Sequence, residues 1–205
     1  MGCAFGAQNK VSMHHVRTTS HTDNCALSTE AALAHSASPA TLRAPMSTAI
    51  PDRPAPLLIA KRFAVVASIY NSEFVDGLVA AAREELAAIA PGSAVEVHRV
   101  PGSFEIPLGV QFVAERRNVD AVFAFGLLWQ GETSHADLIA TSVTKALLDI
   151  SLRMKLPVLH EVIVAQTDEQ ARERCLGTTI NRGTEAARAA VRMLQTLDAI
   201  RGTLR

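Results

Sequence analysis

One short stretch of the chain gathers residue types that could transfer protons at a bound small molecule. It is Ala124-Phe-Gly-Leu-Leu-Trp-Gln-Gly-Glu-Thr-Ser-His135-Ala-Asp137. The apolar run Asp120–Gly126 predicts a strand buried on both faces, and a helical pattern follows it directly. In an open parallel sheet, a strand end and the first turn of the next helix face one crevice, where free backbone N–H groups favour an anion. We therefore predict a ligand site here, with His135 as its proton carrier.

His135 has a plainer interpretation, as a residue that only packs or caps at the start of a helix. Its place among Thr133, Ser134 and Asp137 favours the functional one. Glu105 follows the next strand break, Pro101-Gly102, and could accept hydrogen bonds from a polyol or act as a base. It could equally be a favourable charge in the first turn of a helix.

Three further candidates lie in predicted turns or at the end of a predicted helix. Tyr70 and Trp129 are the chain's single tyrosine and single tryptophan. Both fall in predicted crevice turns, where an aromatic ring can stack on a heterocycle. Arg174, at the end of a short helix, could bind phosphate or simply complement the helix C-terminus, which is the ordinary role of an arginine there.

The elements that must position these residues alternate as βαβαβαβαα. Short apolar runs predict the strands, and apolar spacings of three and four predict the helices. The predicted strands are Arg62–Ser68, Ala94–Val100, Ala121–Phe125 and Leu156–Val164, with His160 and Glu161 placed at the end of the fourth. The predicted helices begin at Asn71 or Ser72, Ser103, His135, Thr167 and Asn181. The first of these helices and the last two each have a side chain at their start that can cap the helix.

This alternation predicts an α/β fold with a four-stranded parallel sheet and helices on both faces. Its ligand crevice lies beyond the carboxyl ends of the strands. The four turns that follow the strands all fall on that edge; they are Ile69–Ser72, Val100–Glu105, Leu127–His135 and Ala165–Thr167. The alternative architecture is a signalling receiver domain. Such a domain needs an acidic cluster after its first strand, and Ala67-Ser-Ile-Tyr-Asn71 has none.

Composition narrows the class of protein. Apolar residues make up 48% of the 205, enough for a core, and 20 basic residues balance 20 acidic ones. This balance gives no general field for nucleic acid or an anionic membrane, and no run is long enough to span a bilayer. Cys3, Cys25 and Cys175 form neither a disulfide framework nor a metal cluster, which favours a reducing cytoplasm and no metal. We interpret Cys175 as a buried helix residue.

Residues 1–60 differ in composition from the rest. They are rich in Ala, Ser, Thr, His and Pro and lack a sustained period. We expect a disordered extension, or translation beginning at Met13 or Met46, and a plastid transit peptide is the alternative. The prolines of Ile50–Pro56 exclude regular helix or an inner strand, so this stretch is a linker or an arm. The predicted domain covers 61–200, with a tail at 201–205.

Four motifs in unbroken order resemble 6,7-dimethyl-8-ribityllumazine synthases. They are Val100-Pro-Gly-Ser-Phe-Glu-Ile-Pro107, Gly126-Leu-Leu-Trp-Gln-Gly-Glu-Thr-Ser-His135, Glu169-Gln-Ala-Arg-Glu-Arg174 and Asn181-Arg-Gly-Thr-Glu-Ala-Ala187. The resemblance spans about 62 to 197 and leaves out the first 60 residues. It implies a flavodoxin-like three-layer α/β/α subunit. It also implies the penultimate step of riboflavin biosynthesis, in which 5-amino-6-ribitylaminouracil condenses with 3,4-dihydroxy-2-butanone 4-phosphate, releasing phosphate and water without cofactor or metal.

The resemblance also assigns roles to residues. It implies proton transfer by His135 in Schiff-base formation and phosphate elimination. Further substrate-binding positions are the pyrimidine-stacking Tyr70 with Asn71 after it, Ser103, Phe104 and Glu105 at the ribityl chain and ring edge, Leu128 and Trp129 through their backbone, and Glu132, Thr133 and Arg174 at the phosphate. Family members form homopentamers with active sites between neighbours, and some assemble further into icosahedral shells.

Three departures from the family pattern bear on affinity and assembly. Gln130 stands where a basic residue usually precedes the Gly-Glu-Thr motif. His160 replaces an aromatic or small residue that contacts the ring from the adjacent subunit. The link from Cys175 to Ile180 replaces one richer in glycine and lysine. The Pro-rich arm also disfavours strand pairing with a neighbour, so we expect a pentamer, with a shell as the alternative.

Overall fold

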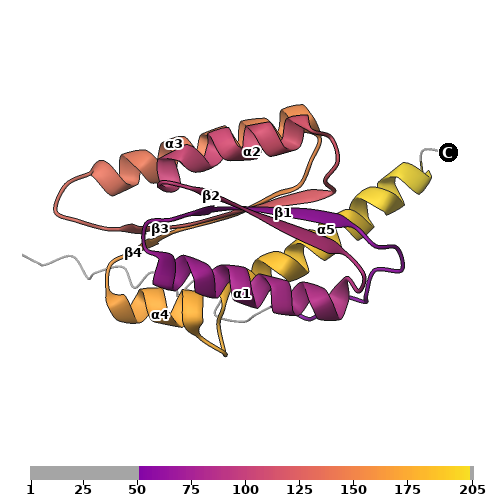
Figure 1. Ribbon diagram of the computed structural model, residues 1–205, viewed down its shortest axis with the longest axis horizontal. Coiled ribbons are helices and arrows are strands. Elements are labelled where there is room, and N and C mark those ends of the chain that lie inside the picture. The colour runs from indigo at the N-terminus through magenta and orange to yellow at the C-terminus, as the bar shows by residue number, and fades with distance from the viewer. Residues whose placement is uncertain (1–50, 204–205) are drawn as a thin grey trace, which may run out of the picture. The chain divides into compact units, whose positions relative to one another are not determined.

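The computed structural model describes residues 51–203, which form a four-stranded, wholly parallel sheet covered by helices on both faces (Figure 1). The strand order is β2-β1-β3-β4, so β2 and β4 are the edge strands. The strands are β1 Arg62–Ser68, β2 Ala94–Val100, β3 Ala121–Trp129 and β4 Val158–Ala165. The flavodoxin-like α/β/α architecture predicted from the sequence is confirmed.

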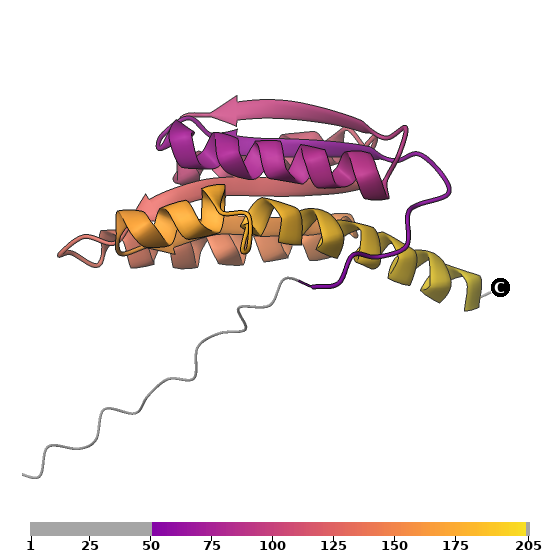
Figure 2. The ribbon, with the colours of Figure 1, turned by 90° about the horizontal axis from the view of Figure 1, so that it is seen from below.

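Helices cover both faces of the sheet (Figures 1 and 2). One layer is α2 Ile106–Glu115 and α3 His135–Met154; the other is α1 Ser72–Ile89, α4 Asp168–Leu176 and α5 Arg182–Thr203. A 3₁₀ turn, Ser103–Glu105, leads into α2. Pro107 lies in the first turn of α2, where its missing N–H costs no helical hydrogen bond.

The buried strands separate two hydrophobic cores. In β1, Phe63 and Val65 face α1 and α5, whereas Ala64 and Val66 face α2 and α3. Successive side chains of a strand point to opposite faces, so a continuous apolar run is what a doubly covered strand requires. Both helix layers thus pack against the same sheet, so the strand ends are fixed relative to both layers.

The chain direction across the sheet reverses between β1 and β3. After β1 the chain goes outward to β2 and then returns to the other side of β1 as β3. Helices that follow β1 and β3 therefore leave the sheet toward opposite faces, and a crevice opens between the two strand ends. Tyr70 and Asn71 follow β1, and Gln130 follows β3, so the fold brings these three to one place.

Several predicted boundaries are wrong in detail. β3 continues to Trp129 instead of ending at Phe125, so Leu128 and Trp129 lie in the strand and not in a turn. β4 runs from Val158 to Ala165, which places His160 in its middle, opposite Ala124 of β3. The longer β3 is held because its register with β4 continues to Trp129 and Ala165, a tertiary pairing that local pattern does not reveal.

The capping predictions have mixed outcomes. Thr167 accepts a hydrogen bond from Gln170 N–H at 3.3 Å, and Asn181 Oδ1 accepts from Gly183 N–H at 2.9 Å, as expected at helix starts. Asn71 precedes α1, but its side chain makes no cap bond, and its backbone is left-handed with φ 59° and ψ 40°. Its carboxamide is hydrogen-bonded to β3 instead of to the helix.

The Pro-rich stretch is an arm held against α1 and α5 (Figure 2). Arg188 donates to Pro51 O at 2.7 Å, Arg192 to Asp52 O at 2.9 Å and Gln195 to Ala55 O at 2.8 Å. Side-chain donors thereby replace the strand ladder that proline cannot join. The remaining predictions for the extension, residues 1–50, and for the last two residues lie outside the described residues.

Glu85 of α1 anchors this arm. Its carboxylate accepts hydrogen bonds from Nε and Nη2 of Arg53, at 2.8 Å each, and from Nε of Arg188 at 2.8 Å. Burial opposes ionisation of Glu85, but the hydrogen bonds and charges of the two arginines outweigh it and lower the pKa of its carboxyl. We call Arg53, Glu85 and Arg188 the arm clamp.

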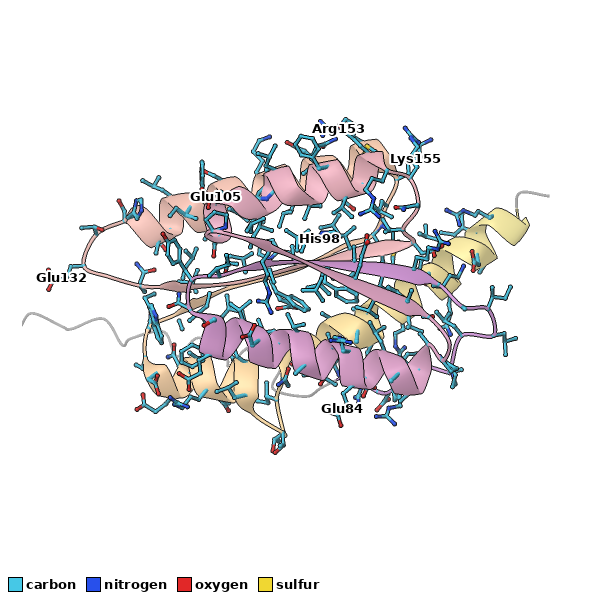
Figure 3. The ribbon with its side chains drawn as sticks, viewed as in Figure 1. Glu84, His98, Glu105, Glu132, Arg153 and Lys155 are labelled. Atoms are coloured by element: carbon cyan, nitrogen blue, oxygen red, sulfur yellow. The ribbon has the colours of Figure 1, made fainter. Side chains whose placement is uncertain are left out.

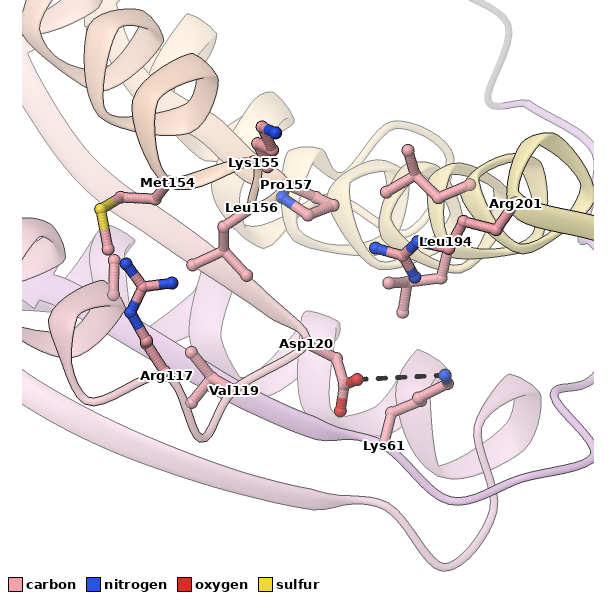
Figure 4. A pocket seen from close by; sticks show the side chains of 12 residues that line it. Lys61, Arg117, Val119, Asp120, Met154, Lys155, Leu156, Pro157, Leu194 and Arg201 are labelled. Atoms are coloured by element: carbon pink, nitrogen blue, oxygen red, sulfur yellow. Dashed lines mark ion pairs between the residues drawn. The ribbon is translucent and has the colours of Figure 1, made fainter. Parts of the chain in front are cut away.

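A cleft opens at the amino end of the sheet, among Lys61, Arg117, Lys155 and Arg201 (Figure 4). Lys61 pairs with Asp120 at 3.9 Å. The other three cations lie at or just beyond the C-terminal ends of α2, α3 and α5. Cations there offset the negative end of a helix, which accounts for the charge of this cleft. No helix among residues 51–203 is long and apolar enough to cross a membrane.

Candidate active site

The carboxyl end of the sheet collects most of the predicted site residues (Figure 3). Glu105 and Glu132 lie at this end, whereas Arg153 and Lys155 lie at the opposite one. The rim here is built from the turns that follow β1, β2 and β3 and from the starts of α3 and α4. Because the turn after β3 runs directly into α3, four separate segments of the chain contribute side chains to one edge of the sheet.

Tyr70 and Glu105 meet across Gly102. Tyr70 N–H donates to Pro101 O at 3.1 Å, which joins the turn after β1 to the turn after β2. Gly102 N–H donates to Glu105 Oε2 at 2.9 Å. A Cβ at Gly102 would lie 3.1 Å from the Tyr70 ring and 3.0 Å from Glu105 Oε2, so glycine permits this close approach. The exposed tyrosine ring and the carboxylate therefore border one surface.

Asn71 connects the two strand ends at the reversal point of the sheet. Its Nδ2 donates to Leu127 O of β3 at 2.9 Å, and its Oδ1 accepts from Trp129 Nε1 at 3.1 Å. Asn71 and Trp129 thus share one hydrogen-bonded unit, and Tyr70 immediately precedes Asn71. Trp129 takes part through its indole, a contact that the resemblance, which gave it only a backbone role, did not predict.

Ser103 and Leu128 are placed against the sheet. Ser103 is buried, and a Cβ at Gly126 would lie 2.6 Å from its Oγ, so Gly126 makes room for the turn after β2. Leu128 is half-buried and packs with the core beneath α2 and α3. Phe104, between Ser103 and Glu105, is instead 63% exposed. An exposed phenylalanine next to this rim is available to a ligand or to another chain.

The residues around His135 form the open side of the rim. Glu132, Thr133, Ser134 and His135 are all exposed, and α3 begins at His135. Among residues 51–203, the side chains of Glu132, Thr133 and His135 have no hydrogen-bond or ion-pair partner. The backbone N–H groups of the first turn of α3 lack helical acceptors and point outward from the helix start. This segment can therefore receive an anion and a proton-accepting group without first breaking internal contacts.

Arg174 lies in a groove next to that segment. The groove is lined by Gln130, Asp137, Val164, Gln166, Gln170 and Arg174. Gln130 N–H donates to Ala165 O at 2.9 Å, and its side chain donates to Asp137 Oδ2 at 3.3 Å. Gln130 stands where a basic residue is usual. These hydrogen bonds fix it in place, and it lines the Arg174 groove as an uncharged residue. The two predicted anion contacts, at the start of α3 and at Arg174, both border the end of β3.

His160 is not on this rim within one chain. It lies in the middle of β4, and its Nε2 is 2.9 Å from Thr144 Oγ1 of α3. The placement of His160 and Glu161 at the end of the fourth strand is wrong, because β4 continues four residues beyond Glu161. A contact of His160 with the ring bound by an adjacent subunit stays a prediction.

Glu161 and Cys175 lie beneath the link between α4 and α5. Burial raises the pKa of Glu161 to about 7, against the opposing charge of Arg182 and with a further contribution from Glu185. Burial also raises the pKa of Cys175 to about 12, which fits its interpretation as a packed helix residue. A thiol in this state is a poor nucleophile.

Three residues that border the site were not among the predicted site residues. Phe74 meets the Trp129 ring edge-on, with centroids 5.6 Å apart and planes at 82°. Arg172 lies over the Phe74 ring, 5.6 Å from its centroid, and pairs with Glu73 at 3.0 Å. Gln170 lines the Arg174 groove. In the local sequence pattern, Phe74 is an ordinary core residue and Gln170 an ordinary capping residue. Only their contacts with distant parts of the chain show that they border the site.

Comparison with known proteins agrees with this arrangement. The family model for 6,7-dimethyl-8-ribityllumazine synthase matches residues 60–198. Proteins of that name from Aquifex aeolicus and Thermus thermophilus are 40% and 36% identical over 143 and 153 residues. These alignments cover 68% and 73% of this chain and 92% and 98% of the relatives. The match includes every element that forms the rim, and we conclude that the chain belongs to the 6,7-dimethyl-8-ribityllumazine synthase family.

Proposed function

We propose that the carboxyl-end rim is the active site at which this chain makes 6,7-dimethyl-8-ribityllumazine. The reaction joins 5-amino-6-ribitylaminouracil to 3,4-dihydroxy-2-butanone 4-phosphate. The observation that supports it most directly is the meeting of Tyr70 and Glu105 at Gly102. Arg174 lines a separate groove together with Asp137, from the first turn of α3. An aromatic face and a polyol-binding carboxylate suit the ribitylaminouracil, and an arginine beside a helix start suits the phosphate.

The pyrimidine half of the site is assigned to the turns after β1 and β2. The Tyr70 ring stacks on the pyrimidine, and Glu105, with Ser103 and Phe104, holds the ribityl chain and ring edge. Asn71 and the backbone of Leu128 and Trp129 line the ring pocket. The exposed position of the Tyr70 ring, 69%, supports this role, since a ring packed into the core would not be available for stacking.

The phosphate half is assigned to the start of α3 and to Arg174. Glu132, Thr133 and the backbone N–H groups at the helix start contact the butanone phosphate, and Gln130 borders it. The unpartnered, exposed state of the Thr133 side chain among residues 51–203 supports this assignment. A single arginine gives a charge-assisted hydrogen bond to a phosphate oxygen, which anchors the substrate without taking part in the bond changes.

The chemistry then needs orientation and one proton carrier. The uracil 5-amino group attacks the butanone carbonyl, and water leaves as the imine forms. Loss of a proton from carbon and expulsion of phosphate follow, and the ring closes with loss of a second water. We assign the proton transfers to His135. Orientation of two substrates can supply effective molarities of up to about 10⁵–10⁸ M, so the histidine is not the only source of rate.

We also infer that the working form is a homo-oligomer, and propose a pentamer with sites between neighbours. Exposed apolar side chains on α2, on α3 and on the 3₁₀ turn before α2 support this; they are Phe104, Leu108, Phe112, Leu148 and Leu152. Phe104, Leu108 and Phe112 are four residues apart, so they form one stripe on the outside of this segment. Binding of the arm to its own α5 favours a pentamer over an icosahedral shell, and light scattering distinguishes the two. We propose a cytoplasmic location, because the spacing of the three cysteines of the chain gives no disulfide framework.

A direct experiment mixes the purified chain with both substrates and follows lumazine absorbance and phosphate release. We expect stoichiometric formation of both products. Ligand binding without phosphate release would support the alternative, a lumazine or flavin binder that has lost turnover. Formation of neither complex nor product would contradict the proposal.

Arg174→Ala tests the phosphate assignment. We expect KM for the butanone phosphate to rise at least about tenfold, as loss of a charge-assisted hydrogen bond implies, while KM for the ribitylaminouracil changes less than about twofold. Arg83→Ala, on α1 away from the rim, is the matched control and leaves both values unchanged. Equal changes in the two KM values of Arg174→Ala would contradict a phosphate-specific role.

A further inference from the structure

Trp129 makes its polar contact with the protein and not with an open pocket. Its indole N–H donates to Asn71 Oδ1 at 3.1 Å, and the Asn71 amide donates to Leu127 O at 2.9 Å. An indole N–H can only donate and a carbonyl oxygen can only accept. The two partners together therefore fix which way round the Asn71 carboxamide lies.

This carboxamide stabilises an unusual backbone. Asn71 has φ 59° and ψ 40°, one of three non-glycine residues among 51–203 with positive φ. Left-handed backbone is unfavourable for a residue with a Cβ, and asparagine tolerates it best when its side chain finds a local partner. Here the partners come from β3, the strand on the other side of the reversal point. The turn after β1 is thus tied to the end of β3.

The same turn determines where Tyr70 lies. Tyr70 immediately precedes Asn71, and the Asn71 carbonyl accepts the N–H groups of Phe74 and Val75, each at 3.1 Å, which starts α1. A different conformation at Asn71 would change the direction of the chain between β1 and α1. The Tyr70 ring would then leave its position beside Gly102 and Glu105.

Packing also holds the indole itself in place. Phe74 meets it edge-on, and Arg172 of α4 lies on Phe74 while pairing with Glu73. The indole is still 40% exposed, so it is supported on one side and open on the other. A rigid donor supported in this way can restrain Asn71 without being buried in the core.

From these contacts we propose that Trp129 is a positioning residue for the pyrimidine substrate. Its indole N–H holds Asn71 in the left-handed turn that presents Tyr70 beside Glu105. This inference rests on the proposed function, since it concerns the half of the site assigned to the ribitylaminouracil. The butanone phosphate, bound at the start of α3 and at Arg174, does not depend on this contact.

Trp129→Phe removes the donor and keeps a ring beside Phe74. We expect KM for the ribitylaminouracil to rise about fivefold to tenfold, as loss of one hydrogen bond implies, and KM for the butanone phosphate to change less than about twofold. Phe74→Leu is the matched comparison, because it removes the ring contact and leaves the indole N–H. It should alter the pyrimidine KM less than Trp129→Phe does.

A double-mutant cycle shows whether Trp129 acts through Asn71. Asn71→Gly allows the left-handed backbone but removes the carboxamide. If the indole works through that carboxamide, adding Trp129→Phe to Asn71→Gly should have little further effect, whereas independent contributions would multiply. The emission of Trp129, the only tryptophan in the chain, gives a second readout. It should shift in Asn71→Gly and respond to the ribitylaminouracil added alone.

The outcomes separate this inference from the proposed function. If the wild-type chain forms no lumazine, the proposed function fails. If the wild-type chain is active but Trp129→Phe leaves the pyrimidine KM within about twofold, or raises both KM values equally, only the positioning role fails. Full multiplicativity in the double mutant would also overturn it.

Discussion

The carboxyl-end rim and the arm clamp both concentrate polar side chains, but they use them in opposite ways. At the clamp, Glu85 is 5% exposed and accepts three hydrogen bonds from two arginines. At the rim, Glu132, Thr133 and His135 are exposed and have no side-chain partner among residues 51–203. Buried polar groups are stable only when they are paired, whereas groups that must bind a ligand have to remain unpaired until it arrives. We therefore expect the clamp to contribute to stability and the rim, as the proposed active site, to contribute to function.

The rim and the arm also differ in their backbone conformation. The rim contains a left-handed asparagine held by a neighbouring strand, whereas the arm has no positive-φ residue and is held by side-chain donors from α5. Unfavourable backbone persists where surrounding contacts impose it, and such residues cluster at functional sites. We expect substitutions at the rim to change kinetics more than stability, and those at the clamp to do the reverse.

The largest expected effect is that of His135→Ala at the rim. General acid–base catalysis typically contributes about 10²–10⁴-fold, so we expect kcat to fall at least about 10²-fold with measurable activity remaining. The free energy of unfolding should change by less than about 0.5 kcal/mol, because the side chain is exposed and unpartnered within residues 51–203. Steady-state kinetics and urea unfolding measure the two quantities. An unchanged kcat would remove the histidine from the mechanism.

Arg188→Ala tests the other side of the comparison. It removes a charged hydrogen bond to Glu85 and the contact to Pro51 O. We expect a loss of about 2 kcal/mol in the free energy of unfolding at neutral pH, with kcat unchanged. Arg192→Ala, on the next turn of α5, loses only a bond to the exposed arm and should cost less than about 1 kcal/mol.

The pH dependence of this loss has a definite sign. The folded-state pKa of Glu85 is lowered, so its contribution is present above the ordinary value and is lost as the pH falls through the lowered pKa. The difference between the wild-type chain and Arg188→Ala should therefore shrink in acid. A difference that stayed constant with pH would show that packing, not charge, carries the effect.

A smaller effect is expected for Glu161→Gln. The pKa of Glu161 is raised to about 7, so the folded chain binds its proton more tightly than the unfolded chain does. Stability should fall as the pH rises from about 4.5 to 7, because the unfolded chain loses its proton first. Since the side chain is only partly buried, we expect Glu161→Gln to be more stable by about 1–2 kcal/mol above pH 7 and nearly equal below pH 4.5. Thermal unfolding at both pH values tests this.

Local sequence patterns were sufficient to predict the architecture, and they led us to propose a site at one edge of the sheet. Apolar runs and apolar spacings of three and four predicted all four strands and the major helices, and their alternation implied a parallel sheet with its ligand edge at the strand ends. These signals are local, because each reflects which face of one element is buried. His135, Glu105 and Tyr70 became site candidates in this way, since they follow directly after strand or turn signals.

Which side chains act together depends instead on contacts between distant parts of the chain. The extension of β3 to Trp129 depends on pairing with β4, and the left-handed Asn71 depends on acceptors and donors from a strand 56 and 58 residues away. The capture of the arm by α5 depends on Arg188, which is 137 residues from Pro51. Such contacts have no period or local spacing, because they arise from the packing of distant elements, and a single sequence does not record them.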